Sequence, residues 1–112
     1  ECGACTVLID RVSAYSCLTL TAACGDRSIT TVEGLANGDT LNRVQAAFIE
    51  HDALQCGFCT PGQIMAAVAL LGENPNPSEA DVRRGMSGNL CRCGTYPKII
   101  RAVLAAAEPV NG

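Results

Sequence analysis

Eight cysteines in 112 residues constrain this chain more than any other feature. Four of them form two closely spaced pairs, Cys56-x2-Cys59 and Cys91-x-Cys93, and each pair stands just before a predicted helix. Backbone N–H groups at a helix start are unpaired and lie at the positive end of the helix dipole, which favours thiolates. Two such helix starts packed face to face would present four sulfurs to one centre. The second half of the chain is therefore predicted to fold around a metal centre.

Cysteines at these spacings serve iron–sulfur clusters, structural zinc or disulfides. Zinc usually takes two C-x-x-C knuckles, and the C-x-C half departs from that pattern. Disulfide frameworks are typical of small secreted chains with little core, whereas 48% of this chain is hydrophobic. A Rieske centre needs two histidines and is excluded, because His51 is the only one in the sequence. The spacing favours a [2Fe–2S] cluster, with a zinc-stapled helical interaction module as the alternative.

Glycines stand close to both motifs, and they are expected to let backbone N–H groups approach the sulfurs: Gly57, Gly62, Gly88 and Gly94. The N-terminal cysteines Cys2, Cys5 and Cys17 are one ligand short of a second cluster. Plant-type [2Fe–2S] proteins begin with the spacing C-x4-C-x2-C. If Cys2 and Cys5 are the second and third cysteines of that pattern, the missing ligand is its first cysteine, five residues before Cys2 and outside this sequence. Cys24 has no partner at a useful spacing and is interpreted as a small buried or surface thiol.

The hydrophobic pattern changes period along the chain. Residues 6–31 have the β-branched runs and turn residues of short strands. A tight turn at Asp10-Arg11 is predicted to lead into a second strand, VSAYSCLTL, at 12–20.

After a connector at about 32–39, four helices are predicted. The first spans about 41–53, with Leu41, Val44 and Phe48 on its apolar face. The second runs from an N-cap at Thr60 to a stop at Gly72, and the third begins at a capping box of Ser78 and Asp81. The fourth runs from Pro97 to about 108, with an apolar stripe that starts at Ile99. Met65 and Met86 are expected in the core.

Charge and hydropathy exclude several kinds of partner. The net charge is −3 and there is no basic run, which argues against nucleic acid. The longest apolar run, IMAAVALL, is far shorter than the roughly 20 residues that span a bilayer. The sequence also lacks a nucleophile–base set or a pair of general-acid carboxylates. We therefore expect no substrate-transforming residue in this chain.

Five stretches in this order, CGACTVLID, SCLTL, ITTVEGL, LQCGFCTPG and GNLCRCGTYPKI, resemble the iron–sulfur subunit of molybdenum hydroxylases. Xanthine dehydrogenase, aldehyde oxidoreductase, carbon monoxide dehydrogenase and isoquinoline oxidoreductase belong to that family. The resemblance runs from residue 2 to about residue 105. It implies an α+β fold: a truncated ferredoxin-like β-grasp remnant at 1–33, a four-helix [2Fe–2S]-binding domain at 34–108 and a tail at 109–112. The front of the β-grasp domain is expected ahead of Glu1.

The resemblance also implies roles for individual residues. The ligands of the molybdenum-proximal cluster would be Cys56, Cys59, Cys91 and Cys93, and three ligands of the distal cluster would be Cys2, Cys5 and Cys17. Gln55 and Cys93 would contact a molybdopterin cofactor. Two departures from the family pattern are Gly94-Thr95 after the last motif, where many members have Thr-Gly, and Arg11 in the hairpin, where Gly is usual.

The implied function is electron transfer. Electrons would pass from molybdenum through both clusters to a flavin or an external acceptor. A large partner subunit would hold molybdopterin, and a flavin subunit with FAD or a cytochrome would be the acceptor. We expect the cytoplasm, with the periplasm as the alternative. Arg92 has two possible interpretations. Its positive charge would stabilise either the reduced cluster or a cofactor phosphate, or it is an ordinary surface charge.

Overall fold

Three short antiparallel strands form a sheet in the first third of the chain. β1 (Thr6–Ile9) lies between β2 (Val12–Tyr15) and β3 (Ile29–Thr30). Asp10 and Arg11 join β1 to β2, with positive φ values of 50° and 72°. Positive φ at both central residues is the geometry of the two-residue type I′ hairpin turn. The turn predicted at these residues is confirmed in this computed structural model, which describes residues 2–107.

The second strand is shorter than the sequence pattern predicts. It ends at Tyr15, and the chain continues as a 3-10 turn at Ser16–Leu18 and a short helix, α1 (Thr21–Cys24). The Ser16 N–H still follows the register of the β1–β2 pair, because it donates to the Cys5 carbonyl at 3.3 Å. The departure comes at the next residue, where the Cys17 N–H donates to the Cys5 sulfur at 3.4 Å. This bond turns the chain around the Cys5 sulfur instead of extending the strand.

Four helices follow a short 3-10 turn at Val32–Gly34. They are α2 (Arg43–Glu50), α3 (Thr60–Glu73), α4 (Glu79–Gly85) and α5 (Tyr96–Ala107). Two predicted ends of α3 are wrong. Its N-cap is Cys59 and not Thr60, and Gly72 lies inside the helix, which is capped by Asn74. The predicted tail at 109–112 lies outside the described residues.

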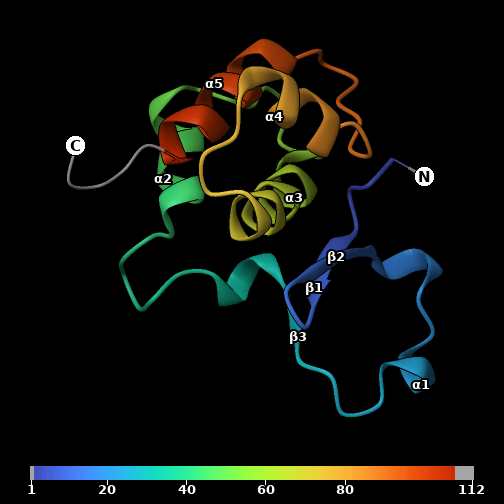
Figure 1. Cartoon of the computed structure of the whole chain (residues 1–112). Helices are drawn as coiled ribbons and strands as arrows, with labels where there is room; N and C mark the ends of the chain where they lie inside the picture. Colours follow the sequence, from blue (N-terminus) through green and yellow to red (C-terminus); the bar gives the residue numbers. More distant parts are fainter. Residues whose placement is uncertain (1, 108–112) are drawn as a thin grey trace.

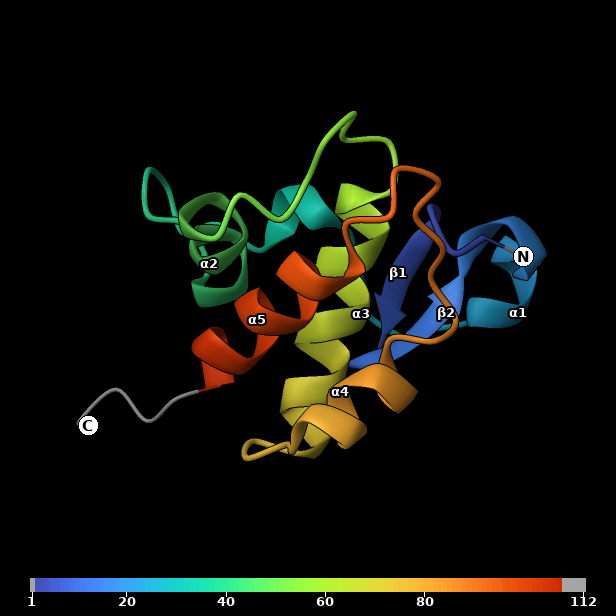
Figure 2. The same ribbon diagram turned by 90° about the horizontal axis from the view of Figure 1, so that it is seen from above.

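The helices pack around a core of alanines and medium-sized apolar side chains, with Phe48, Val82 and Ile99 at its centre. Small alanines let the helix axes approach closely. α3 contacts both the helical core and the sheet. Ile64, Ala66 and Ala67 pack in the helical core, whereas Met65 and Ala69 pack against Leu8 of β1. Figures 1 and 2 place the sheet beside α3, with α2, α4 and α5 around the rest of that helix.

The predicted burial is confirmed at Met65 and Met86, and wrong at Leu41. Leu41 is 46% exposed because α2 begins only after Asn42, whose side chain forms a capping box with Gln45. Within residues 2–107 no helix has the length and apolar character that a membrane crossing requires.

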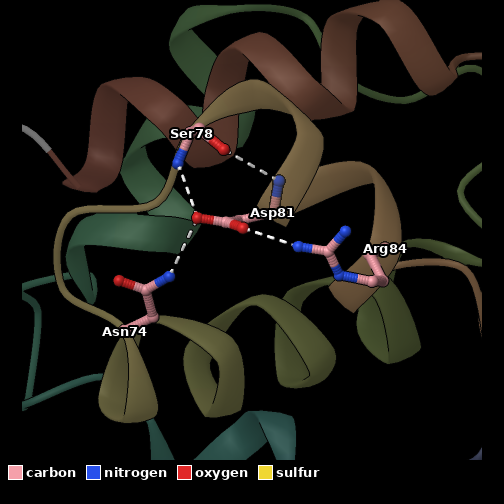
Figure 3. A network of polar contacts seen from close by, with 4 residues as sticks. All are labelled: Asn74, Ser78, Asp81 and Arg84. Carbon is pink, nitrogen blue, oxygen red and sulfur yellow. Dashed lines mark hydrogen bonds and ion pairs between the residues drawn. The ribbon is translucent and has the colours of Figure 1, made fainter.

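The capping box predicted for α4 is confirmed (Figure 3). The Ser78 hydroxyl accepts from the Asp81 N–H at 3.1 Å, and the Asp81 carboxylate accepts from the Ser78 N–H at 3.1 Å. Asn74 and Arg84 also donate to this carboxylate. The bond from the Ser78 backbone is the main reason why the pKa of Asp81 is lowered. The network fixes the start of α4 and the turn from α3.

Replacing Ser78 with Ala should loosen the first turn of α4. Loss of an N-cap side chain typically costs about 1 kcal/mol, so amide exchange in residues 80–82 should be about fivefold faster. Hydrogen exchange followed by mass spectrometry measures this. Ser87→Ala is the control, because the Ser87 hydroxyl donates to the Arg84 carbonyl at the other end of the helix. Equal exchange in both variants would contradict the capping role.

Candidate metal centre

The structure brings together the four cysteines of the helical half. Cys56 and Cys59 lie on the loop that enters α3, and Cys91 and Cys93 lie on the loop that enters α5. Their sulfurs interact across the two loops in two pairs, Cys56 with Cys93 and Cys59 with Cys91. A [2Fe–2S] cluster takes four thiolates, two on each iron, so each pair matches one iron.

The backbone supplies the N–H donors that a buried anionic centre needs. The Phe58 N–H is the main cause of the lowered pKa of Cys56. Burial alone would raise the pKa of Cys91, but hydrogen bonds from the Thr95 side chain at 3.1 Å, and from the backbone of Thr95 and Cys93, lower it to about 7. These contacts stabilise thiolate over thiol. The donor set therefore fits an iron–sulfur cluster.

At Cys59, the second cysteine of the C-x-x-C motif, burial has the largest effect on the pKa. It raises the pKa of Cys59 to about 11, so without a metal ion this sulfur carries its proton. Within residues 2–107, no three or more His, Cys, Asp and Glu side chains stand as a group that would hold a single metal ion. The predicted ligand role of the four cysteines stays a prediction that rests on their pairing and their donors.

Two of the three N-terminal cysteines also meet. The Cys17 N–H donates to the Cys5 sulfur, and this bond is the main reason why the pKa of Cys5 is lowered to about 7. Cys2 is exposed and lines a pocket of about 630 Å³, together with Cys56, Cys59 and Cys91. One end of the CGAC loop, residues 2–5, therefore holds the Cys5 sulfur, and the other end, Cys2, faces the same pocket as the cysteines of the helical half. Cys24 is buried and its thiol donates to the Leu20 carbonyl, as expected of a structural thiol.

A bridging segment, Gly88–Leu90, connects the two cysteine groups. Its first residue accepts a hydrogen bond from the hydroxyl of Tyr15 on β2. Its last residue, directly before Cys91, donates its N–H to the Cys2 carbonyl at 2.8 Å. Both figures of the whole chain show the segment between α4 and α5 beside the start of the chain.

The middle residue of the bridging segment makes the most contacts. Asn89 is buried, and its side-chain N–H2 donates to the Gly3 carbonyl at 2.9 Å and to the Thr6 hydroxyl at 3.1 Å. Gln63, only 1% exposed, donates to the Asn89 carbonyl at 3.2 Å and also contacts Cys59. The sequence pattern alone does not point to either residue. The one signal it offers is that each is a polar residue close to a cysteine motif, Gln63 in an apolar helix and Asn89 in a Gly-rich loop.

The surface around the pocket is unusually apolar. Phe58 is 88% exposed and Leu90 is 55% exposed, and both line the pocket with Arg92 and Tyr96. Exposed aromatic and aliphatic side chains around one pocket are typical of a protein interface. Gln55 is also exposed, one residue before Cys56.

Comparison with known proteins decides the family. The model of the [2Fe-2S] binding domain family matches residues 31–104, which include the paired cysteines of both helical motifs. The chain belongs to the [2Fe–2S] iron–sulfur subunits of molybdenum hydroxylases. A nicotinate dehydrogenase subunit from Pseudomonas putida is 53% identical over 108 residues, covering 96% of this chain and 69% of the relative. The nicotine 6-hydroxylase small subunit of Paenarthrobacter nicotinovorans is 53% identical over 110 residues, covering 98% and 66%.

Solved structures of the family have the same fold. Quinoline 2-oxidoreductase from Pseudomonas putida 86 matches with a TM-score of 0.89 and 53% identity, over 95% of this chain and 67% of that one. Aldehyde oxidoreductase from Desulfovibrio gigas matches with a TM-score of 0.93 and 40% identity, over all of this chain and 13% of that one. The predicted α+β class, with a small sheet followed by four helices, is confirmed. The chain spans about two thirds of the length of these two small-subunit relatives.

The pKa values predict different alkylation of two cysteines in the reduced, metal-free chain. Thiolates react with iodoacetamide and thiols do not, so modification of Cys5 should rise with a midpoint near its pKa of about 7. Modification of Cys59 should still be rising well above that pH, because burial raises its pKa to about 11. Peptide mass spectrometry after brief labelling across a pH series measures both curves. A shared midpoint would contradict the pairing of Cys5 with the Cys17 N–H.

Proposed function

We propose that this chain transfers electrons through two [2Fe–2S] clusters within a molybdopterin-dependent hydroxylase or dehydrogenase. The observation that carries the proposal is the pairing of sulfurs from two loops, Cys56 with Cys93 and Cys59 with Cys91, with backbone N–H groups directed at them. The contact between Cys5 and Cys17 supports a second cluster, to which Cys2 would add a third ligand. These clusters would take up and release one electron at a time.

The chain's own residues would hold the clusters and set their potentials. Donors such as the Phe58, Thr95 and Cys93 N–H groups reduce the cost of extra negative charge on the sulfurs. Burial of Cys59 and Cys91 keeps water from one side of the proximal site. Both effects change the reduction potential of a cluster. The chain itself would carry no substrate-transforming residue.

The proposed partner is a large subunit that holds molybdopterin. It would cover the exposed Phe58 and Leu90, because an apolar rim around paired cysteines is the surface that most needs covering. Gln55 and Cys93 would contact the pterin. A flavin subunit with FAD, or a cytochrome, would accept electrons from the distal cluster. In domain terms, residues 1–33 would serve the distal cluster and residues 34–108 the proximal one.

The competing proposal is a zinc-stapled helical interaction module, and metal analysis separates the two. Anaerobically purified subunit in its complex should contain equal amounts of iron and acid-labile sulfide. After reduction with dithionite it should give two different [2Fe–2S] EPR signals. Zinc without labile sulfide or an EPR signal would establish the module and overturn electron transfer.

Replacing Cys93 with Ser should abolish or strongly alter the signal of the proximal cluster, because one thiolate of its Cys56 pair is lost. Turnover with the physiological acceptor should fall by at least about tenfold, since the electron path begins there. Cys24→Ser is the matched control, because Cys24 is a buried thiol that donates to the Leu20 carbonyl. An unchanged proximal signal in Cys93→Ser would remove Cys93 from the ligand set.

A further inference from the structure

We propose that Asn89 is a positioning residue that sets the spacing between the two cluster-binding loops. The inference rests on the proposed function, because it concerns the electron step between the two clusters. Asn89 lies two residues before Cys91 in the proximal site. Its side chain reaches into the CGAC loop, where Gly3 stands between two predicted distal ligands. One side chain therefore connects both sites.

The Gly3 carbonyl is the centre of this connection. It accepts the Thr6 N–H at 3.0 Å, the Thr6 hydroxyl at 2.6 Å and the Asn89 amide at 2.9 Å. All three residues are buried. A buried carbonyl with three donors is expensive to separate from any of them, because water cannot replace the lost bond. The CGAC loop is thus held at a fixed place relative to the bridging segment.

The backbone around the Gly3 carbonyl is packed so closely that a single added Cβ at Gly3 or Gly62 would overlap a neighbouring atom. Gly3 has φ of +85°, and a Cβ on it would lie 2.5 Å from the Asn89 amide nitrogen. On the other side, a Cβ on Gly62 of α3 would lie 2.2 Å from the Gly3 carbonyl oxygen. The CGAC loop is therefore packed between α3 and Asn89. Gly62 therefore has a steric role in this packing, and its predicted role in giving N–H groups access to sulfur stays a prediction.

Gln63 connects the same bonds to the proximal sulfurs. It follows Gly62, is fully buried, donates to the Asn89 carbonyl and contacts Cys59. Its amide oxygen is buried without a hydrogen-bond partner in the described chain, so the amide is held by its two other contacts. The order of contacts runs from Cys59 through Gln63 and Asn89 to Gly3. A shift of the CGAC loop would therefore change the distance between the predicted clusters.

The spacing matters because electron tunnelling falls steeply with distance. Alongside the Asn89 contacts, the Leu90 N–H donates to the Cys2 carbonyl at 2.8 Å, which places the residue before Cys91 in direct contact with a predicted distal ligand. The geometry assigns Asn89 the task of holding this bond closed. Two reduced clusters at a fixed short spacing also couple magnetically, which gives a readout independent of turnover.

The test uses the complete subunit in its complex, with variants Asn89→Asp and Gly62→Ala. The first keeps the side-chain shape but places a carboxylate against the Gly3 carbonyl. The second pushes the CGAC loop from the opposite side. Gly72→Ala is the matched control in the same helix, because a Cβ there meets nothing within 4 Å. Thr6→Val, which removes only the hydroxyl bonded to Gly3 and Asn89, is a milder third variant.

Two measurements decide the outcome. Hydrogen exchange at Leu90 should be at least about tenfold faster in both Asn89→Asp and Gly62→Ala. The first variant leaves the buried Gly3 carbonyl without its Asn89 donor, and the second overlaps this carbonyl with a Cβ, so both favour local opening. In the same samples the splitting of the reduced EPR signals should change while iron and labile sulfide stay at wild-type amounts. Gly72→Ala should match wild type in both, and Thr6→Val should shift both in the same direction by less.

Failure of this inference is distinguishable from failure of the proposed function. Wild-type exchange and splitting in Asn89→Asp, Gly62→Ala and Thr6→Val would overturn the positioning role while leaving two clusters intact. A wild-type subunit with a single [2Fe–2S] signal would overturn the two-cluster relay and the electron step assigned to Asn89 with it. Loss of cluster in Asn89→Asp alone leaves Thr6→Val and Gly62→Ala to decide, because neither removes the Asn89 side chain.

Discussion

The hydrogen bonds that converge on the Gly3 carbonyl connect the two halves of this molecule. The sheet is too small to be stable by itself, since β3 has two residues and no residue of β2 is fully buried. Its partners are α3, through Leu8 and Met65, and the bridging segment, through Asn89. Without these contacts the CGAC loop would have no fixed position relative to the helical cysteines. The relative position of the two predicted clusters follows from this junction.

The helical half has a more conventional basis. Its core is built from alanine and β-branched residues, and its helices start at side-chain caps, Asn42 for α2 and Ser78 for α4. The start of α3 differs, because its N-cap is Cys59 and no side chain caps it. The Thr60 N–H donates instead to the Gly57 carbonyl at 3.3 Å, within the loop that carries Cys56 and Cys59. A cluster bound by this loop would stabilise the start of α3, as bound metal centres stabilise small domains.

Much of the fold could be predicted because its signals are local. The Asp10-Arg11 turn, the Ser78–Asp81 capping box and the apolar stripe of α5 each depend on residues close in sequence. The end of β2 could not be predicted, since it depends on the bond from the Cys17 N–H back to the Cys5 sulfur. Propensity favoured a longer strand, and the contact with a sulfur-bearing loop overrode it.

The candidate site divides in the same way. Cysteine spacing identified which sulfurs meet in the helical half, because the spacing fixes how two loops can present four thiols. It could not identify Asn89, whose partners Gly3 and Thr6 lie 86 and 83 residues away in the chain. The same holds for Gln63, which reaches Asn89 across 26 residues. A buried amide is recognisable from its bonds and not from its neighbours in sequence.

The central claim is that electrons pass from the cluster on Cys56, Cys59, Cys91 and Cys93 to the cluster on Cys2, Cys5 and Cys17. Freeze-quench EPR of the oxidised complex after mixing with its substrate tests this most directly, with the proximal signal assigned beforehand by its loss in Cys93→Ser. The proximal signal should appear first, and the distal signal should follow as the first declines. Reduction of the distal cluster before the proximal one, or of neither, would contradict it.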